Sequence, residues 1–421
     1  MGRRKTFDPQ SGKSVIMFST RMLLSGGSRL FPHQPKHFLL SQNARNFSVI
    51  AGTGINADGL PELDLDQSSP VLESTPITNP RVRILTLNRP KTLNALNLEM
   101  GSTLAQRLKR LNKQGDQIDC VVIQGNGRGF CSGGDLKELY ENRNDSLFAE
   151  NYFRTVYTLN YVLKSTLGVG LVSILDGVAM GGGMGIAMGS RYRVATENTI
   201  VAMPEVNIGL HPDTGMSYWG SRLKGNYGQY LATGVRIDGR EAVERNIATH
   251  FVQSQNIPLL LERIAVINSD RPHQSMKAIL DDFTEYSADG KEEERKKKAE
   301  IIEKCFAEGS ARDILYKVLR EMRLQDAARM MKCACPLSME LAVESLRRGK
   351  SADIKECIQA DYRLSVRLVR DRDFFEGIRA MVIDKDRTPQ WSTSFDGLSS
   401  MNVQQFFDPF GKEENCAELD I

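Results

Sequence analysis

The sequence predicts an α/β fold followed by a helical C-terminal region. Up to about residue 260, segments with strand patterns alternate with segments of helical spacing, the order of elements found in α/β domains. From about Ile264 onward the strand patterns fade and amphipathic helices remain. With 421 residues, 41% of them hydrophobic, the chain can bury a large core.

The expected elements follow from apolar periodicity and from the glycines and prolines that end it. Leu171–Met180 is the most apolar segment and predicts one buried strand, and the small residues after it open a helix. In chain order we expect strands at Val82–Pro90, Gln117–Gly127, Val172–Gly177, Tyr192–Glu197 and Thr199–Pro204, and helices at Asn94–Lys113, Met180–Gly189, Lys291–Phe306, Leu337–Gly349 and Ile354–Val369.

The first fifty residues have a different composition. They carry eight lysines and arginines but a single acid, Asp8, and serine is frequent. This composition is typical of a mitochondrial transit peptide, and Ala44–Ser48 resembles a processing site. We therefore predict a transit peptide at residues 1–47 and a location in the mitochondrial matrix. A basic tail without a targeting role, and N-myristoylation of the start at Met1–Thr6, are the alternatives.

The remaining boundaries follow changes in composition. Ile55–Pro80 is polar and rich in Pro, Ser and Thr, which predicts a linker over residues 48–80. We place an α/β core at 81–263, the helical region at 264–395 and a polar tail at 396–421. The charged helix at Lys291–Phe306 mixes acids with bases, which favours a solvated face.

Composition and spacing also argue against several classes of partner. A formal charge of +3 is too small to indicate nucleic acid, and no apolar run reaches the ~18–20 residues that span a bilayer. The seven cysteines are scattered, as expected in a reducing compartment, and Cys333 and Cys335 have no zinc-type partner cluster. We expect no metal, no nucleic-acid motif and no membrane span.

Three loops carry the candidate chemistry: Gly125–Leu136, Asp176–Gly185 and Val201–Gly215. The glycines of the first two do not have the spacing of a dinucleotide fingerprint. A glycine turn that enters a helix offers free N–H groups at a positive dipole end, so two such turns face to face can hold an oxyanion. Glu205 and Asp213 in the third loop would add acid/base groups. Tight turns that pack a crowded core are the alternative.

Four stretches in order resemble the crotonase (enoyl-CoA hydratase/isomerase) superfamily: "LTLNRPKTLNALN", "GRGFCSGGDL", "GVAMGGGMG" and "AMPEVNIGLHPDTG". The last stretch and Asp361–Trp391 are most similar to its 3-hydroxyisobutyryl-CoA hydrolase branch. The resemblance implies a crotonase fold, a spiral of ββα units with a helical C-terminal region. It also implies a coenzyme A thioester as substrate, with no separate cofactor.

The resemblance assigns roles by motif position. The backbone N–H groups of Ser132 and Gly182 would form the oxyanion hole, with Gly133 and Gly181 beside them in the substrate-binding loops. Glu205 matches the family's catalytic glutamate and Asp213 its partner acid. Lys91 matches a contact for the phosphates of coenzyme A, and a solvated surface lysine is the alternative.

Departures from the family pattern indicate which of the family's reactions this chain is expected to catalyse. Gly185 stands where hydratases carry a second glutamate, so the resemblance implies thioester hydrolysis rather than hydration. The expected substrate is a short 3-hydroxyacyl-CoA, most plausibly 3-hydroxyisobutyryl-CoA in valine breakdown. Thr155 and Val156 replace a Glu-Glu pair usual in the branch, which puts the level of activity and the acyl preference in doubt.

Two other functions remain open at this stage. One is a non-catalytic component of the mitochondrial ribosomal small subunit, which the missing glutamates and the basic leader permit and the intact Glu205 and Asp213 argue against. The other is a hydratase or isomerase for a different acyl-CoA. The sequence leaves open whether the chain forms a homo-oligomer.

Overall fold

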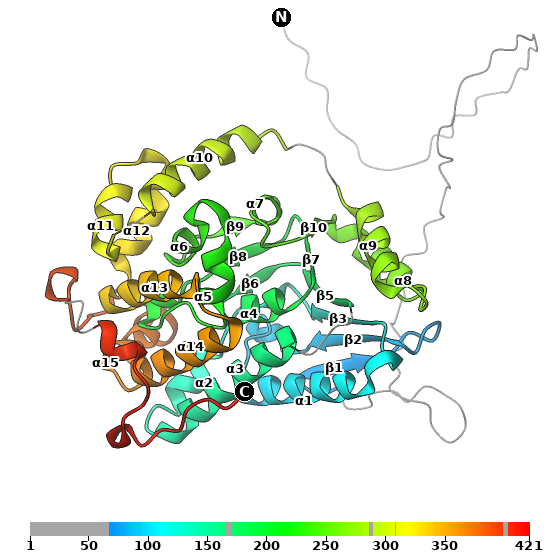
Figure 1. The fold of residues 1–421 in the computed structure, drawn as a ribbon, viewed down its shortest axis with the longest axis horizontal. Helices are drawn as coiled ribbons and strands as arrows, with labels where there is room; N and C mark the ends of the chain where they lie inside the picture. The colour runs from blue at the N-terminus through cyan, green and yellow to red at the C-terminus, as the bar shows by residue number, and fades with distance from the viewer. Residues whose placement is uncertain (1–66, 166–169, 286–288, 308, 399–402) are drawn as a thin grey trace, which may run out of the picture. The chain divides into compact units, whose positions relative to one another are not determined.

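The computed structural model describes residues 67–165, 170–285, 289–307, 309–398 and 403–421. All of them belong to one unit, Ile50–Ile421 (Figure 1). The predicted transit peptide and its processing site lie outside the described residues. Among the described helices, none combines the length and the apolar character that a membrane span requires.

Ten strands form two sheets in the described part of the chain. In the larger sheet the order is β1 (Val71–Ser74), β2 (Val82–Leu87), β3 (Cys120–Gly125), β5 (Gly170–Leu175), β7 (Tyr192–Ala195) and β10 (His250–Phe251); all neighbours are parallel except β1 and β2. In the smaller sheet the order is β4 (Gly129–Cys131), β6 (Val178–Met180), β8 (Ile200–Ala202) and β9 (Ile237–Asp238), with only β9 antiparallel.

Consecutive strands divide between the two sheets in a repeating way. In each of the pairs β3/β4, β5/β6 and β7/β8, the first strand joins the larger sheet and the second joins the smaller one. Helices follow each pair: α2 and α3 after the first, α4 after the second and α5 after the third. This repeat confirms the predicted α/β fold built as a spiral of ββα units.

The helices between and after the strands cover the sheets (Figure 1). In Figure 1, α14 lies beside α3, and α3 also packs on α1 and α4. The helices are α1 (Leu98–Gln114), α2 (Leu136–Glu141), α3 (Ser146–Ser165), α4 (Gly182–Gly189), α5 (Met216–Trp219), α6 (Tyr227–Leu231), α7 (Gly239–Glu244), α8 (Ile257–Ile264), α9 (Pro272–Phe283), α10 (Glu292–Cys305), α11 (Ala311–Val318), α12 (Gln325–Cys333), α13 (Pro336–Gly349), α14 (Ile354–Val369) and α15 (Arg372–Ile378).

The prediction of one strand at Leu171–Met180 is wrong. The segment forms β5 and β6, which belong to different sheets, with a turn at Asp176 and Gly177. Gly177 has φ +112°, and a Cβ there would lie 2.2 Å from the carbonyl oxygen of Arg128. Only glycine permits both the backbone angle and this close approach, so the apolar run has to change sheets here.

The predicted linker at 48–80 is also wrong in its last residues, because Val71–Ser74 forms β1. This strand pairs antiparallel with β2, with Val71 opposite Leu87. Val71 is fully buried, and the buried Glu73 forms an ion pair with Arg107 at 3.2 Å. Backbone hydrogen bonds to β2 hold this strand in place. Because these bonds come from another segment, the weak local periodicity of the sequence could not predict the strand.

The predicted polar tail packs on α3 and α14 over residues 403–421. Arg154 of α3 donates hydrogen bonds to the carbonyl oxygens of Ala417 and Glu418, and Arg367 of α14 pairs with Glu414 at 2.8 Å. The side chain of Leu419 is buried at 1% exposure. The last residues therefore form part of the helical region.

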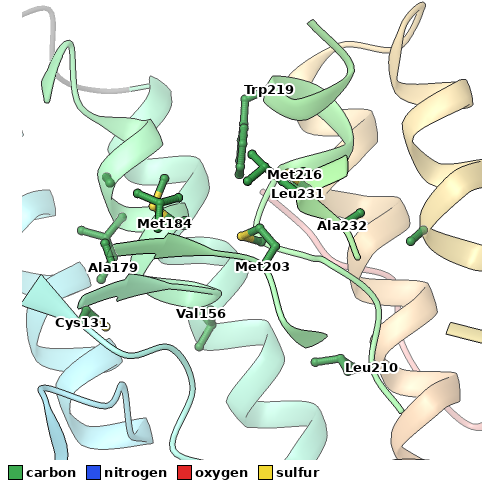
Figure 2. Packing of buried hydrophobic residues seen from close by; sticks show 14 of the residues in the cluster. Cys131, Val156, Ala179, Met184, Met203, Leu210, Met216, Trp219, Leu231 and Ala232 are labelled. Atoms are coloured by element: carbon green, nitrogen blue, oxygen red, sulfur yellow. The ribbon is translucent and has the colours of Figure 1, made fainter. Parts of the chain in front are cut away.

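The main hydrophobic cluster lies between the sheets and the helices of the C-terminal region. Figure 2 shows a part of it, with Cys131 of β4, Ala179 of β6, Met184 of α4 and Val156 of α3. Because β4, β6 and β8 are parallel neighbours, the loops after them emerge at the same edge of the smaller sheet. These three loops are the ones that the sequence singled out.

Candidate active site

The two glycine loops face each other at this edge. A Cβ at Gly133 would lie 3.2 Å from the carbonyl oxygen of Met180 and 3.8 Å from the Cα of Gly181. A Cβ at Gly182 would lie 3.7 Å from the backbone nitrogen of Gly134. The loops therefore meet backbone to backbone, as the oxyanion hypothesis requires, and glycine permits this close approach.

The structure contradicts Ser132 as a donor of the oxyanion hole. Its N–H donates to the carbonyl oxygen of Leu93 at 3.0 Å, and its hydroxyl donates to the carbonyl oxygen of Thr92 at 3.1 Å. Among the described residues, the N–H of Gly134 has no protein acceptor, and it lies beside Gly182. Gly134 therefore replaces Ser132 as the partner of Gly182.

Gly182 is the first residue of α4, so its N–H has no acceptor within the helix. Gly181 precedes it with φ +48°, a left-handed angle that glycine adopts without strain. The eight residues of α4 place the positive end of the helix dipole at this point. Two N–H donors, from Gly134 and Gly182, are thus available for one developing negative charge.

Glu205 begins the short 3-10 turn Glu205–Ile208 that follows β8. Its carboxylate lies against the second glycine loop, because a Cβ at Gly181 would be 2.5 Å from Oε1. Its other oxygen, Oε2, is buried and has no partner among the described residues. A carboxylate with an unused oxygen beside two free N–H groups is placed to act on a bound carbonyl.

Asp213 is also buried, with 5% exposure against 6% for Glu205, and it lies close enough for its charge to act on Glu205. Burial and the Asp213 charge raise the pKa of Glu205 well above its usual range. Burial also raises the pKa of Asp213, and a hydrogen bond from Tyr157 at 2.7 Å opposes part of this effect. The pair therefore retains a proton more readily than two exposed carboxyl groups would.

A buried polar network behind Asp213 was not predicted from the sequence. Tyr157 contacts the hydroxyl of Ser365 at 2.5 Å, and Ser365 lies 3.1 Å from Nε2 of His211. Asp361, one turn before Ser365, accepts from the N–H of Gly215 at 2.7 Å. A signal was present: Asp361 and Ser365 are four residues apart on the apolar stripe of α14, where polar residues need partners.

Gly185, where hydratases carry a second glutamate, has no room for a side chain. A Cβ there would lie 2.5 Å from the Cβ of Thr214 and 2.6 Å from Oδ1 of Asn160. The positions that replace the family's Glu-Glu pair are also filled. Val156 is buried in the main cluster, and a Cβ at Gly101 of α1 would lie 3.5 Å from Thr155 Cγ2.

Lys91 lies in the exposed turn Pro90–Thr92. This turn adjoins the first glycine loop, because the carbonyl oxygens of Thr92 and Leu93 accept the hydrogen bonds of Ser132. The structure thus brings Glu205, Asp213, Gly133, Gly181 and Gly182 together and places Lys91 at the surface nearby. No group of three His, Cys, Asp or Glu residues suited to a metal occurs in the described part of the chain.

This chain is similar to several known proteins. Residues 82–407 match the family described as enoyl-CoA hydratase/isomerase. The chain is 36% identical over 353 residues to "Probable 3-hydroxyisobutyryl-CoA hydrolase 3" of Arabidopsis thaliana, covering 81% of this chain and 92% of the relative. It is 35% identical to the mitochondrial 3-hydroxyisobutyryl-CoA hydrolase of Danio rerio, covering 77% and 86%.

Two further likenesses bear on the function. "Small ribosomal subunit protein mS47" of Arabidopsis thaliana is 35% identical, with 80% of this chain and 85% of that protein covered. The crystal structure of a carnitinyl-CoA dehydratase from Mycobacterium thermoresistibile superposes with a TM-score of 0.72 at 29% identity, covering 83% of this chain and 98% of that one. The chain belongs to the enoyl-CoA hydratase/isomerase family and, within it, to the branch of the 3-hydroxyisobutyryl-CoA hydrolases.

Proposed function

We propose that this protein hydrolyses the thioester of 3-hydroxyisobutyryl-CoA to 3-hydroxyisobutyrate and free coenzyme A. The observation that carries the proposal is the buried carboxyl pair Glu205 and Asp213, set against two glycine loops with free N–H groups. The relatives named for this reaction support the substrate. The packed position of Gly185 argues against hydration, because a second catalytic glutamate cannot stand there.

In this mechanism the thioester carbonyl oxygen lies between the N–H groups of Gly134 and Gly182. One such donor typically contributes about 2.7–4 kcal/mol to the stabilisation of an oxyanion. Glu205, in its ionised form, attacks the carbonyl carbon or takes a proton from an attacking water. Breaking of the carbon–sulfur bond then releases the thiolate of coenzyme A. Where Glu205 is the nucleophile, water then hydrolyses the mixed anhydride that it has formed with the acyl group, which releases the free acid and restores Glu205.

Asp213 has the complementary role in the proposal. In its protonated form it binds the 3-hydroxyl group of the acyl chain and gives its proton to the departing thiolate. Besides burial, the Asp213 charge raises the pKa of Glu205, so Glu205 ionises more readily as the base once Asp213 holds the proton. The pair thus supplies a base and an acid at the same pH.

The setting of the reaction is also part of the proposal. The named relatives include mitochondrial proteins, and the leader at residues 1–47 has the composition of a transit peptide, so we place the protein in mitochondria and, more specifically, in the matrix. Valine breakdown is the pathway to which we assign the substrate. Lys91, exposed beside the first glycine loop, would contact the phosphates of coenzyme A, and no separate cofactor enters the reaction.

A second candidate function is a structural role in the mitochondrial ribosomal small subunit. The similarity to the mS47 protein favours it, since that identity equals the identity to the zebrafish hydrolase. The replacement of the usual acids by Thr155 and Val156 is compatible with a protein that has no catalytic activity. However, the chain retains Glu205 and Asp213, although burial of these two acids lowers the stability of the fold. A purely structural role gives no reason to keep them, so their retention argues for the enzyme.

One assay separates the two functions. The purified chain is given 3-hydroxyisobutyryl-CoA and the release of free thiol is followed. Glu205→Gln should abolish release while binding of coenzyme A persists. Glu241→Gln is the matched control, because Glu241 is equally buried, at 6%, but pairs with Lys298 away from the site. Absence of release by the parent, together with co-sedimentation with mitochondrial ribosomes, would establish the structural role instead.

A further inference from the structure

The buried network behind Asp213 forms one continuous line. Tyr157 Oη lies 2.7 Å from Asp213 Oδ2 and 2.5 Å from Ser365 Oγ, which lies 3.1 Å from His211 Nε2. The other ring nitrogen, Nδ1, lies 3.2 Å from the carbonyl oxygen of Pro212. Tyr157, Ser365 and His211 all have 0% exposure, so water does not supply their partners from bulk solvent.

Three separate parts of the chain build this line. Tyr157 comes from α3, Ser365 from α14, and His211 from the loop that carries Asp213. The packing of α3 against α14 sets the spacing between the first two side chains. The four polar groups come from three segments and are buried, so each depends on the others for its hydrogen bonds.

The line has a consistent direction when Asp213 is ionised. A carboxylate only accepts, so Tyr157 donates to Asp213 and Ser365 donates to Tyr157. Nε2–H of His211 then faces two acceptors, Ser365 Oγ at 3.1 Å and the carbonyl oxygen of Asp361 at 3.3 Å. Neutral His211 then carries its proton on Nε2.

The direction reverses when Asp213 is protonated. Asp213 then donates to Tyr157, Tyr157 donates to Ser365, and Ser365 donates to an unprotonated Nε2. His211 now carries its proton on Nδ1, where the carbonyl oxygen of Pro212 accepts it at 3.2 Å. Both ring nitrogens are hydrogen-bonded in this arrangement, whereas in the first arrangement the unprotonated Nδ1 faces the carbonyl oxygen of Pro212 and makes no hydrogen bond to it.

We propose that Tyr157, Ser365 and His211 are positioning residues that form a reversible relay, in which His211 changes tautomer when Asp213 gains or loses its proton. The step from ionised to protonated Asp213 takes up one proton. Nδ1 gains it from solvent during local opening of the loop that carries His211. The Nε2 proton passes to Ser365, the Ser365 proton to Tyr157, and the Tyr157 proton to Asp213. The reverse step releases one proton. Burial, which lowers the pKa of His211 to about 4, keeps the ring neutral throughout.

Other titratable groups face the relay. Glu205 and Tyr152 interact with Asp213, and Asp361 of α14 interacts with both Asp213 and Tyr157. Glu205 shares the proton of the pair, so its titration has to be separated from that of Asp213. Glu205→Gln does this: glutamine does not titrate and the relay groups are unchanged, so the tautomer change should persist in this variant and report Asp213 alone.

The test is the tautomer of His211, read from the ¹⁵N shifts of the full chain labelled at its five histidines. His211→Gln assigns the signal. Between pH 5.5 and pH 9, within the ordinary range of such spectra, we expect a change from the Nδ1–H to the Nε2–H tautomer without an imidazolium signal. Tyr157→Phe and Ser365→Ala should each leave one tautomer at all pH values. Tyr152→Phe is the matched control, because this buried tyrosine of α3 donates to Leu96 and lies outside the relay, and it should retain the change.

A single tautomer across the pH range in the parent, or an imidazolium, would overturn the relay. So would a tautomer change that survives in both Tyr157→Phe and Ser365→Ala. The catalytic use of the relay rests on the proposed hydrolase function, but this measurement needs no turnover. Thiol release with a fixed tautomer overturns the relay alone, and a tautomer change without thiol release supports the relay while the hydrolase function fails.

Discussion

The carboxylate of Glu205 lies directly against the Cα of Gly181, so that a methyl group at position 181 would be 2.5 Å from Oε1. This contact joins the base of the proposed reaction to the loop that supplies one of the oxyanion donors. It also means that the two loops cannot be altered independently. Four predictions follow from this and from neighbouring contacts.

Gly181→Ala should lower kcat by about 100-fold, because displacement of a catalytic group by about 1 Å has an effect of that size. Gly115→Ala is the matched control: Gly115 has φ +50°, close to the +48° of Gly181, but nothing lies within 4 Å of its Cβ position. Both variants carry similar backbone strain and should lose similar thermal stability. Equal kcat in the two variants would refute the contact between Gly181 and the reacting carboxylate.

Gly134→Ala should also lower kcat, by about 100-fold, because the new Cβ would lie 2.6 Å from the Tyr152 hydroxyl and would shift the N–H donor. Adding Tyr152→Phe removes the colliding oxygen and should restore part of the loss. Ser132→Ala should retain the kcat of the parent, since the Ser132 N–H remains bound to Leu93. Steady-state kinetics of the four proteins test this; a large loss in Ser132→Ala would return Ser132 to the site.

Glu205→Gln should stabilise the protein at pH 8 by a few degrees in Tm and have little effect at pH 5. The folded-state pKa of Glu205 is raised, so the native state binds more protons than the unfolded state above about pH 4, and stability falls as pH rises. Glutamine does not titrate and avoids this loss. Glu241→Gln should instead lower Tm at both pH values, because it breaks the ion pair with Lys298. Thermal unfolding at the two pH values decides; a Glu205→Gln Tm below that of the parent at pH 8 would contradict the raised pKa.

Val156→Glu should not improve catalysis, although an acid is usual near this position in the branch. Val156 is 3% exposed and packs in the main cluster, where a carboxyl group would be buried without a designed partner. We expect a loss of stability that grows from pH 5 to pH 8, because a buried carboxyl group resists ionisation. Val156→Gln should lose stability equally at both pH values. A Val156→Glu variant with unchanged Tm and higher kcat would show that this position opens to the substrate.

Several elements that were predicted from the sequence are present in the structure, and others were missed. The strand at Val82–Leu87, the helix at Ile354–Val369 and the charged helix at Glu292–Cys305 lie where periodicity placed them, because one face of each is buried. The glycine turn that begins at Asp176 was visible in the sequence, but the separate strand at Val178–Met180 was not, because the residues on both sides of Gly177 are apolar. Val71 was missed because its strand depends on a partner across the sheet.

The order of the three loops, the acids Glu205 and Asp213, and the family were determined by the sequence alone. Local patterns carry this information, since glycines, acids and strand ends are visible residue by residue. Only the tertiary structure decided that Gly134, and not Ser132, keeps a free N–H, and that Tyr157, Ser365 and His211 stand in line behind Asp213. The reason is physical: whether a donor is free, or a buried polar group is partnered, depends on an acceptor from a distant segment, and packing alone brings the two together.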